Sequence, residues 1–472
     1  MLEAAKNERT RLLGLSEEYR NETRRLWMEY LSRPWTPVEA DDPLQRPLED
    51  DPDMPVMLLE AYDYDVGETF EIPSDVLEIG KEMYSDGYFD DFPVFKEMVE
   101  GDGQVSVRLN GFELVVRCPD EGMVRLDGTT ETEIASALGR MMDISYHNTL
   151  RDLSRAREIL SLSDWSFVKL VERFSDKICG SGSLSESVLL QAYILNQFGF
   201  HLCLGRSDEG RLYKLMAVDA DLYDYVSYGY EGERFYLLDD DRLDGNVRLT
   251  VISLPSGAKR PMHMRMNPDE KFHMDASKEM KFAPSRYPNL FMAVSTDLSR
   301  MEFYGDYPMF YTEGEPLTTY FHHAMMPLSD DVKENVYAVL KQAVAGRSEL
   351  EAVNILLNVV QTSFPYLKDK DVWGRERYFF PDELWCYGGG DCEDKSILFS
   401  RLVRDILKMP VALVYWPGHL SCAVCFTDDV KGAYFNVGSE RFVSCDPTYE
   451  NAYVGAVMNN YRSQYAELIL LP

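Results

Sequence analysis

A run of three glycines directly before a single cysteine constrains this chain more than any other feature. Residues 387–396 read Tyr-Gly-Gly-Gly-Asp-Cys-Glu-Asp-Lys-Ser, and apolar residues recur at helical spacing after them. This pattern places Cys392 in the first turn of an amphipathic helix. The free N–H groups of a helix start lower the pKa of a thiol and offer donors to an oxyanion. The carboxylates of Glu393 and Asp394 oppose the first effect, so a separate base is needed.

Two later segments can supply that base and a group to orient it. His419 lies between two β-type runs joined by Pro417-Gly418, which predicts a tight turn. Asp446 follows the β-type run 441–445 and precedes a proline, so it is expected at the end of a strand. A helix followed by two neighbouring antiparallel strands could bring Cys392, His419 and Asp446 together.

The local contexts of these three residues carry a family resemblance. Gly-Asp-Cys392-Glu-Asp, Pro-Gly-His419-Leu and Cys-Asp446-Pro-Thr-Tyr occur in this order within residues 330–472. Together they resemble the transglutaminase-like superfamily of papain-type thiol enzymes, in a bacterial member with several domains. The resemblance implies a Cys-His-Asp triad and acyl-transfer chemistry on a core of one helix packed against an antiparallel sheet. It does not choose between peptide hydrolysis, amide hydrolysis and cross-linking.

In the expected mechanism His419 takes the thiol proton and Asp446 holds the imidazole in the required tautomer. The acyl-enzyme is then resolved by water, in a cysteine peptidase or amidase, or by an amine, in a transglutaminase. Hydrolysis is the first prediction. The alternative from a different class is a non-enzymatic module that binds protein or glycan on the same scaffold. No cofactor and no metal site are expected.

Aromatic side chains are concentrated just before the nucleophile, in residues 365–387. Such a loop could line a substrate groove or could simply pack over the edge of the domain, and the sequence leaves both open. The groove candidates are Trp373, Tyr378 and, from a later strand, Trp416. The resemblance implies a second oxyanion donor from the same loop, for which Trp385 and Tyr387 are the candidates. The first donor would be the backbone N–H of Cys392.

Charge and cysteine content limit the possible partners. The net charge of −32 argues against nucleic acid and anionic membranes, because phosphate binding needs clustered lysine and arginine. The eight cysteines form no recognisable disulfide framework, and the single Cys422-x-x-Cys425 pair lacks the partners of a zinc site. A peptide or protein substrate is expected, with cell-wall peptides as one option. No apolar run reaches the length of a membrane span. Without a leader the chain would be cytoplasmic, and with one removed it would be exported. The oligomeric state is left open.

The helix–strand pattern around Cys392 has a parallel earlier in the chain. Residues 184–204 align without gaps on 393–413, and Glu233-Arg-Phe235 aligns on Glu440-Arg-Phe442. This favours an old duplication over a chance likeness. In the alignment Cys392 falls on Ser183 and His419 on Gly210, so the first copy is expected to be catalytically dead.

The expected fold class is therefore α+β, with a papain- or transglutaminase-like core that is duplicated, its first copy degenerate, and a β-rich domain between the copies. An Asn110-Gly111 turn between alternating apolar residues predicts a hairpin in the region before the first copy. The expected segments are a polar helix (1–33), a proline-rich acidic linker (34–55), a small α+β domain (56–150), the degenerate copy (151–245), the β-rich domain (246–325) and the catalytic domain (326–472).

Overall fold

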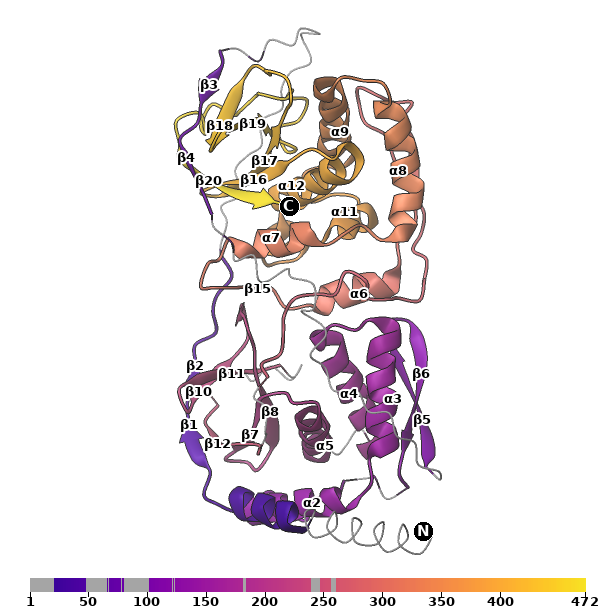
Figure 1. The fold of residues 1–472 in the computed structure, drawn as a ribbon, viewed down its shortest axis with the longest axis vertical. Coiled ribbons are helices and arrows are strands. Elements are labelled where there is room, and N and C mark those ends of the chain that lie inside the picture. The colour runs from indigo at the N-terminus through magenta and orange to yellow at the C-terminus, as the bar shows by residue number, and fades with distance from the viewer. Residues whose placement is uncertain are drawn as a thin grey trace, which may run out of the picture. The chain divides into compact units, whose positions relative to one another are not determined.

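The computed structural model describes residues 21–47, 66, 68–77, 79, 102–120, 122, 124–180, 184–238, 247–255 and 260–472. The chain divides into two compact units, each a mixture of helices and antiparallel sheet (Figure 1). The first unit comprises Met1–Leu44 and Gly87–Lys271, and the second comprises Gln45–Asp86 and Phe272–Pro472. The expected segments 56–150 and 246–325 are therefore each divided between the two units.

The first unit packs helices and a hairpin beside a curled sheet (Figure 1). Residues 21–31 are helical, which covers the described part of the expected polar helix. The predicted hairpin is present, with Asn110 and Gly111 at φ 50° and 78° in its turn. Its elements are β5 (Gly103–Leu109), β6 (Phe112–Cys118), α2 (Glu131–Asp143), α3 (His147–Leu160), α4 (Asp164–Cys179) and α5 (Leu184–Gln197).

The sheet of the first unit has the strand order β1-β12-β7-β8-β11-β10-β2. Its strands are β1 (Thr36–Val38), β2 (Ala40–Asp41), β7 (Leu202–Ser207), β8 (Leu212–Ala217), β10 (Ser227–Tyr230), β11 (Glu233–Leu237) and β12 (Leu249–Ser253), with the short β9 (Asp221–Leu222) outside this order. β1 and β2 are one residue apart, yet they pair with opposite edges of the sheet. The two edges therefore approach each other, and the sheet curls.

Residues 36–41 correct the expectation of a linker over 34–55, because they form strands rather than a bare connection. Proline is compatible with strands at the edge of a sheet, where Pro37 lies in β1, since its missing N–H is not needed for pairing on the outer side. Residues 48–55 of the expected linker lie outside the described residues.

The second unit places helices against another curled sheet (Figure 1). Helix α9 starts in a capping box between Ser348 and Glu351. The elements of this unit before the strands of the sheet are α6 (Leu298–Asp306), β15 (Phe310–Tyr311), α7 (Thr318–Met325), α8 (Asp330–Val344), α9 (Glu349–Ser363), α10 (Asp369–Val372), α11 (Pro381–Tyr387), α12 (Cys392–Leu402) and the π-helical turn η2 (Val403–Leu407).

The sheet of the second unit has the order β3-β18-β19-β17-β16-β20-β4. Its strands are β3 (Phe70–Glu71), β4 (Ser74–Val76), β16 (Val411–Trp416), β17 (His419–Cys425), β18 (Ala433–Val437), β19 (Glu440–Cys445) and β20 (Ala466–Leu471). β3 and β4 are close in sequence but pair with opposite edges, so this sheet also curls. One of its faces carries an apolar core that includes Val414, Trp416, Ala423 and Phe435.

The five central strands follow the same order in the two units. Read across the sheet, the order β20-β16-β17-β19-β18 of the second unit corresponds strand for strand to the order β12-β7-β8-β11-β10 of the first. A helix, α12 or α5, precedes the first of these strands in each case. This is the arrangement that a duplication predicts. Gly210 lies in the turn between β7 and β8 at φ 83°, whereas Ser183 lies outside the described residues.

The region 246–325 differs from the expected β-rich domain. Its first apolar run forms β12, which is an internal strand of the first unit's sheet. Among the described residues that follow, β13 (Met280–Phe282) and β14 (Met292–Val294) pair only with each other, and helices α6 and α7 come next. Pro255, Pro261 and Pro268 lack the backbone donors that a continuing sheet requires, which explains why the strand pattern stops.

Candidate functional site

Cys392 is the first residue of α12, as the glycine run predicts. Gly388 ends α11 at φ 77°, a left-handed conformation that glycine adopts without strain. At Gly390, a Cβ atom would lie 2.4 Å from the Oδ2 of Asp394, so only glycine fits there. The backbone N–H of Asp391 donates to the same Asp394 carboxylate at 3.3 Å and fixes the start of the helix. Each of these two glycines thus has a separate structural reason.

The thiol of Cys392 lies in an acidic environment. Its Sγ donates to Oε2 of Glu393 at 3.2 Å. Burial, followed by the nearby charges of Asp391 and Asp369, raises the pKa of Asp394 well above its ordinary value. The thiol therefore has to leave Glu393 before another group can take its proton.

His419 and Asp446 form a buried pair on neighbouring strands. His419 is the first residue of β17, Asp446 directly follows β19, and Nε2 of the histidine lies 3.0 Å from Oδ2 of the aspartate. The other oxygen of Asp446 accepts hydrogen bonds from the backbone and hydroxyl of Thr448 at 2.9 and 2.6 Å. Burial by itself would raise the pKa of Asp446, but His419 and Thr448 outweigh it and hold the pKa below its ordinary value. The aspartate is therefore charged and fixed.

The imidazole of His419 packs against two aromatic rings that also stack on each other, with centroids 5.1 Å apart. Tyr461 stacks on it with ring centroids 4.9 Å apart, and Trp416 stacks at 5.9 Å. With Nε2 on Asp446, the remaining ring nitrogen, Nδ1, is buried and has no hydrogen-bond partner among the described residues. The arrangement leaves that nitrogen able to exchange a proton with a group that approaches it.

Helix α12 is attached to both strands that carry this pair. The hydroxyl of Ser396, one helical turn after Cys392, donates to the carbonyl of Leu420 at 3.0 Å, and Leu420 directly follows His419. The ammonium of Lys395 donates to the carbonyl of Gln361 at 3.3 Å, and the side chain of Gln361 donates to the carbonyl of Asp446 at 2.9 Å. The first turns of α12 thus lie beside the start of β17 and the end of β19.

The strand alternation shows which way the site faces. The thiol of Cys422 points to α12, where it donates to the carbonyl of Ser396, whereas Ala423 packs in the apolar core on the other face. By this alternation the side chain of His419 shares the face of Ala423. Cys392 is 1% exposed and His419 is 0% exposed. The thiol and the imidazole are thus both closed to solvent. Helix α12, which carries Cys392, packs on the Cys422 face of β17, so the imidazole and this helix lie on opposite faces of the strand.

The two candidates for the second oxyanion donor have different surroundings. Trp385 is fully buried between Phe282 and Phe364, and its indole Nε1 has no hydrogen-bond partner among the described residues. Tyr387 is 36% exposed and packs edge-on against Trp373. Trp385 is the more suitable of the two as an oxyanion donor. Burial of its N–H group without an acceptor costs free energy, and a hydrogen bond to an oxyanion would recover that cost.

The three groove candidates lie in separate clusters. Trp373 packs with Tyr387 around the guanidinium of Arg377, which lies 4.3 Å from the Trp373 ring centroid. Tyr378 is buried against Tyr320, and Trp416 is buried in the core beside His419. Tyr378 and Trp416 therefore pack inside the unit, which is the alternative to lining a substrate groove.

A group of carboxylates that sequence reasoning missed lies just before the nucleophile. Ligand atoms of Asp369, Glu376 and Asp391 come within 4.8 Å of one another, close enough to hold a cation. One oxygen of Asp369 is already engaged by the backbone N–H of Arg377. The three residues are spread over the irregular segment before α12, so no ligand spacing in the sequence could indicate them.

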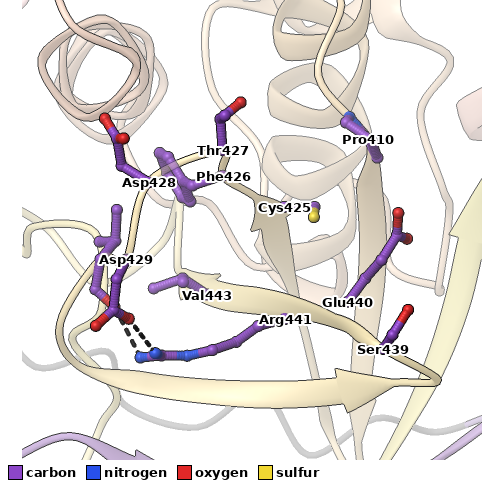
Figure 2. A pocket seen from close by; sticks show the side chains of 11 residues that line it. Pro410, Cys425, Phe426, Thr427, Asp428, Asp429, Ser439, Glu440, Arg441 and Val443 are labelled. Atoms are coloured by element: carbon purple, nitrogen blue, oxygen red, sulfur yellow. Dashed lines mark hydrogen bonds and ion pairs between the residues drawn. The ribbon is translucent and has the colours of Figure 1, made fainter.

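A cavity lies at the ends of β17 and β19 that are remote from His419 and Asp446 (Figure 2). It measures about 540 Å³ and is lined by Cys425, Asp429, Glu440 and Arg441, among others. Since β17 runs from His419 to Cys425, this cavity lies about 20 Å from the histidine at the usual rise of a strand. It is therefore separate from the Cys-His-Asp residues.

No family model matches the chain, and no curated protein matches its sequence. Among the helices in the described ranges, none has both the length and the apolar content needed to cross a membrane.

Proposed function

We propose that the second unit carries a thiol-dependent acyl-transfer centre that hydrolyses peptide or amide bonds. Cys392 is the nucleophile, His419 the base and Asp446 the residue that orients it. The observation that carries the proposal is the 3.0 Å contact of His419 Nε2 with Asp446, combined with a buried Nδ1 that has no partner in the described part of the chain. The position of Cys392 at the start of a helix tied to both strands supports it further.

The proposed reaction gives each of the three residues one role. Nδ1 of His419 takes the proton of the Cys392 thiol, and the imidazolium is stabilised by the charged Asp446. The thiolate attacks the carbonyl carbon, the C–N bond breaks, and the leaving amine takes the proton from His419. Water then donates a proton back to His419 as it attacks the thioester, which releases the acid and restores the thiol. An amine in place of water would give cross-linking.

Activation of this centre requires a local opening. The thiol in the closed arrangement donates to Glu393, so this hydrogen bond must break before the proton can pass to His419. A peptide that enters the site must also displace whatever covers Cys392. Opening of this kind is common at sites where a lid or loop excludes water.

A binding module on the same scaffold is the second candidate function. The burial of both the thiol and the imidazole favours it, because a working nucleophile has to meet its substrate. In that case the His419–Asp446 pair would serve as a structural element of the sheet.

Alkylation of the native protein by iodoacetamide between pH 5 and pH 9, with site-resolved mass spectrometry, tests the proposal. We expect Cys392 to react faster than Cys422 and Cys445, two other buried cysteines of the same unit. His419→Ala should reduce this rate at least about 10-fold, since the base is lost. Glu393→Gln should increase it, because it removes a charge that favours the neutral thiol.

The partly exposed Cys425 serves as the internal control, and its labelling should be equal in all variants. Equal labelling of Cys392 and Cys422 in the native protein, with no effect of His419→Ala, would favour the binding module. Hydrolysis of model peptides, cell-wall stem peptides and glutamine donors then separates the possible substrates.

A further inference from the structure

A second cavity in the same unit has a positive and aromatic lining. It is lined by Arg46, Arg375, Arg377 and His323, together with aromatic rings that include Tyr378 and Phe380. Among the described residues that line it there is no aspartate or glutamate. In a chain with a net charge of −32, three arginines around one small space concentrate positive charge locally, although Arg377 is paired with Glu383.

Two of the arginines are held in place by their own contacts. Arg46 donates to the backbone carbonyl of Glu376. Arg377 donates to the carboxylate of Glu383 and lies over the rings of Trp373 and Phe379. Guanidinium groups fixed in this way lose little side-chain entropy when they bind a planar anion.

His323 brings a hydrogen-bond acceptor to the cavity. The ring is 6% exposed, stacks on Phe380 with centroids 4.1 Å apart, and bonds the backbone of Phe379. Burial, with a smaller contribution from Arg377, lowers the pKa of His323 to about 4, so the ring is neutral at pH 7. Its Nδ1 is buried and has no hydrogen-bond partner within the described ranges. Because the other nitrogen donates to Phe379, Nδ1 offers a lone pair and requires a donor.

The size of the cavity limits what it can hold. Its free space is about 30 Å³. Since one water-sized sphere needs about 10–15 Å³ on this measure, the cavity has room for two or three atoms of the size of an oxygen. Counted out to its opening to solvent, the empty space is about 360 Å³. The cavity can therefore take the three polar atoms of a carboxylate and a neighbouring hydroxyl or amino group while the carbon atoms lie in the opening.

We propose that this cavity binds a small carboxylate that carries a hydrogen-bond donor on the adjacent carbon, as an α-hydroxy acid or the end of an amino acid does. The arginines receive the carboxylate oxygens, and Nδ1 of His323 accepts the neighbouring O–H or N–H. This site does not depend on the proposed acyl transfer. The cavity lies close to α12, the helix that carries Cys392. Its lining residues Tyr378 and Phe380 flank Phe379, whose backbone N–H donates to Asp394 of that helix at 2.8 Å.

Calorimetric titration of the full chain at pH 7 with glycolate and with acetate tests the proposal. Acetate has the carboxylate but lacks the adjacent donor. We expect glycolate to bind about 5-fold more tightly than acetate, which is the usual value of one hydrogen bond to a buried neutral acceptor. Competition at equal strength by sulfate, which carries no hydrogen-bond donor at pH 7, would instead indicate general anion binding and would overturn the donor requirement.

Three variants make the test specific. Arg375→Gln should weaken binding of both acids at least about 10-fold, because hydrogen bonds to charged groups are lost. His323→Phe keeps a ring to stack on Phe380 but removes the acceptor, so it should abolish the preference for glycolate and leave acetate binding in place. Arg347→Gln, an arginine on the exposed surface of the same unit, is the matched control and should change neither.

Thermal unfolding of each variant shows whether it is folded. If His323→Phe is unstable, His323→Asn provides a second route, since its amide oxygen can accept the same hydrogen bond and should retain the preference. Unchanged affinity in a folded Arg375→Gln protein, or an undiminished preference in a folded His323→Phe protein, would overturn the proposal. Failure of the native chain to bind either acid would do the same.

Discussion

Lys395 gives a prediction whose size follows from the structure. It is three residues after Cys392, is 2% exposed, and donates to the carbonyl of Gln361. Burial lowers the pKa of Lys395 from 10.5 to about 8, and the nearby carboxylates of Glu450 and Asp446 compensate only in part. The folded state therefore holds this proton less tightly than the unfolded state does.

The consequence for stability has a definite sign. Between about pH 8 and pH 10.5 the unfolded chain binds more protons at this residue, so the free energy of unfolding rises with pH in this window. Below pH 8 the full penalty applies, and at 1.36 kcal/mol per pKa unit it is about 3 kcal/mol. Methionine is similar in length to lysine and uncharged, so Lys395→Met should remove this penalty. The lost hydrogen bond to Gln361 should cost about 1 kcal/mol, which reduces the net gain in stability.

Urea unfolding of the native protein and of Lys395→Met at pH 7, 8, 9 and 10 measures this difference. The variant should be more stable by about 2 kcal/mol at pH 7, and its advantage should shrink as the pH approaches 10. Lys333→Met, at a more exposed lysine of the same unit, is the control and should show no such trend. A variant that is less stable than the native protein at every pH would refute the reasoning.

Three further predictions concern the helix start and the triad. Asp446→Asn should destabilise the fold by about 1.5–3 kcal/mol at pH 7, because the buried His419 loses a hydrogen bond to a charged acceptor. Since the folded pKa of Asp446 is lowered, this difference should disappear as the pH falls below about 4, which unfolding at pH 3 can check. Gly390→Ala should cost about 1–3 kcal/mol of unfolding free energy through its clash with Asp394, whereas Gly346→Ala, with open space around it, should cost only backbone strain. Trp385→Phe should leave thermal stability nearly unchanged. If its Nε1 is the oxyanion donor, the variant should lower turnover of an amide substrate about 100-fold or more, and equal turnover would exclude that role.

The sequence was most informative where a residue type has one physical explanation. The glycines before Cys392 predicted the turn and helix start, because a left-handed residue and a close approach both require glycine. The Asn110-Gly111 turn predicted the hairpin for the same reason. The order of helix and strands around His419 and Asp446 followed from apolar alternation.

The other features of the fold and of the candidate site depend on long-range contacts, which leave no local pattern in the sequence. Tyr461 and Gln361 surround the His419–Asp446 pair from segments with no motif of their own. Strands β1 to β4 are so short that they depend on pairing with distant strands, so residues 36–41, within the proline-rich stretch 34–55, resembled a linker. The burial of the thiol and its bond to Glu393 are also set by tertiary packing.

The central claim is that Nδ1 of His419 takes the proton of the Cys392 thiol once the hydrogen bond of that thiol to Glu393 opens. The titration of the His419 ring nitrogens, followed by ¹⁵N NMR in the native protein and in Cys392→Ala, tests this most directly. Two groups that share a proton titrate as a coupled pair, so removal of the thiol should shift the apparent pKa of the ring by about one unit or more. Identical titration curves in the two proteins would contradict the account.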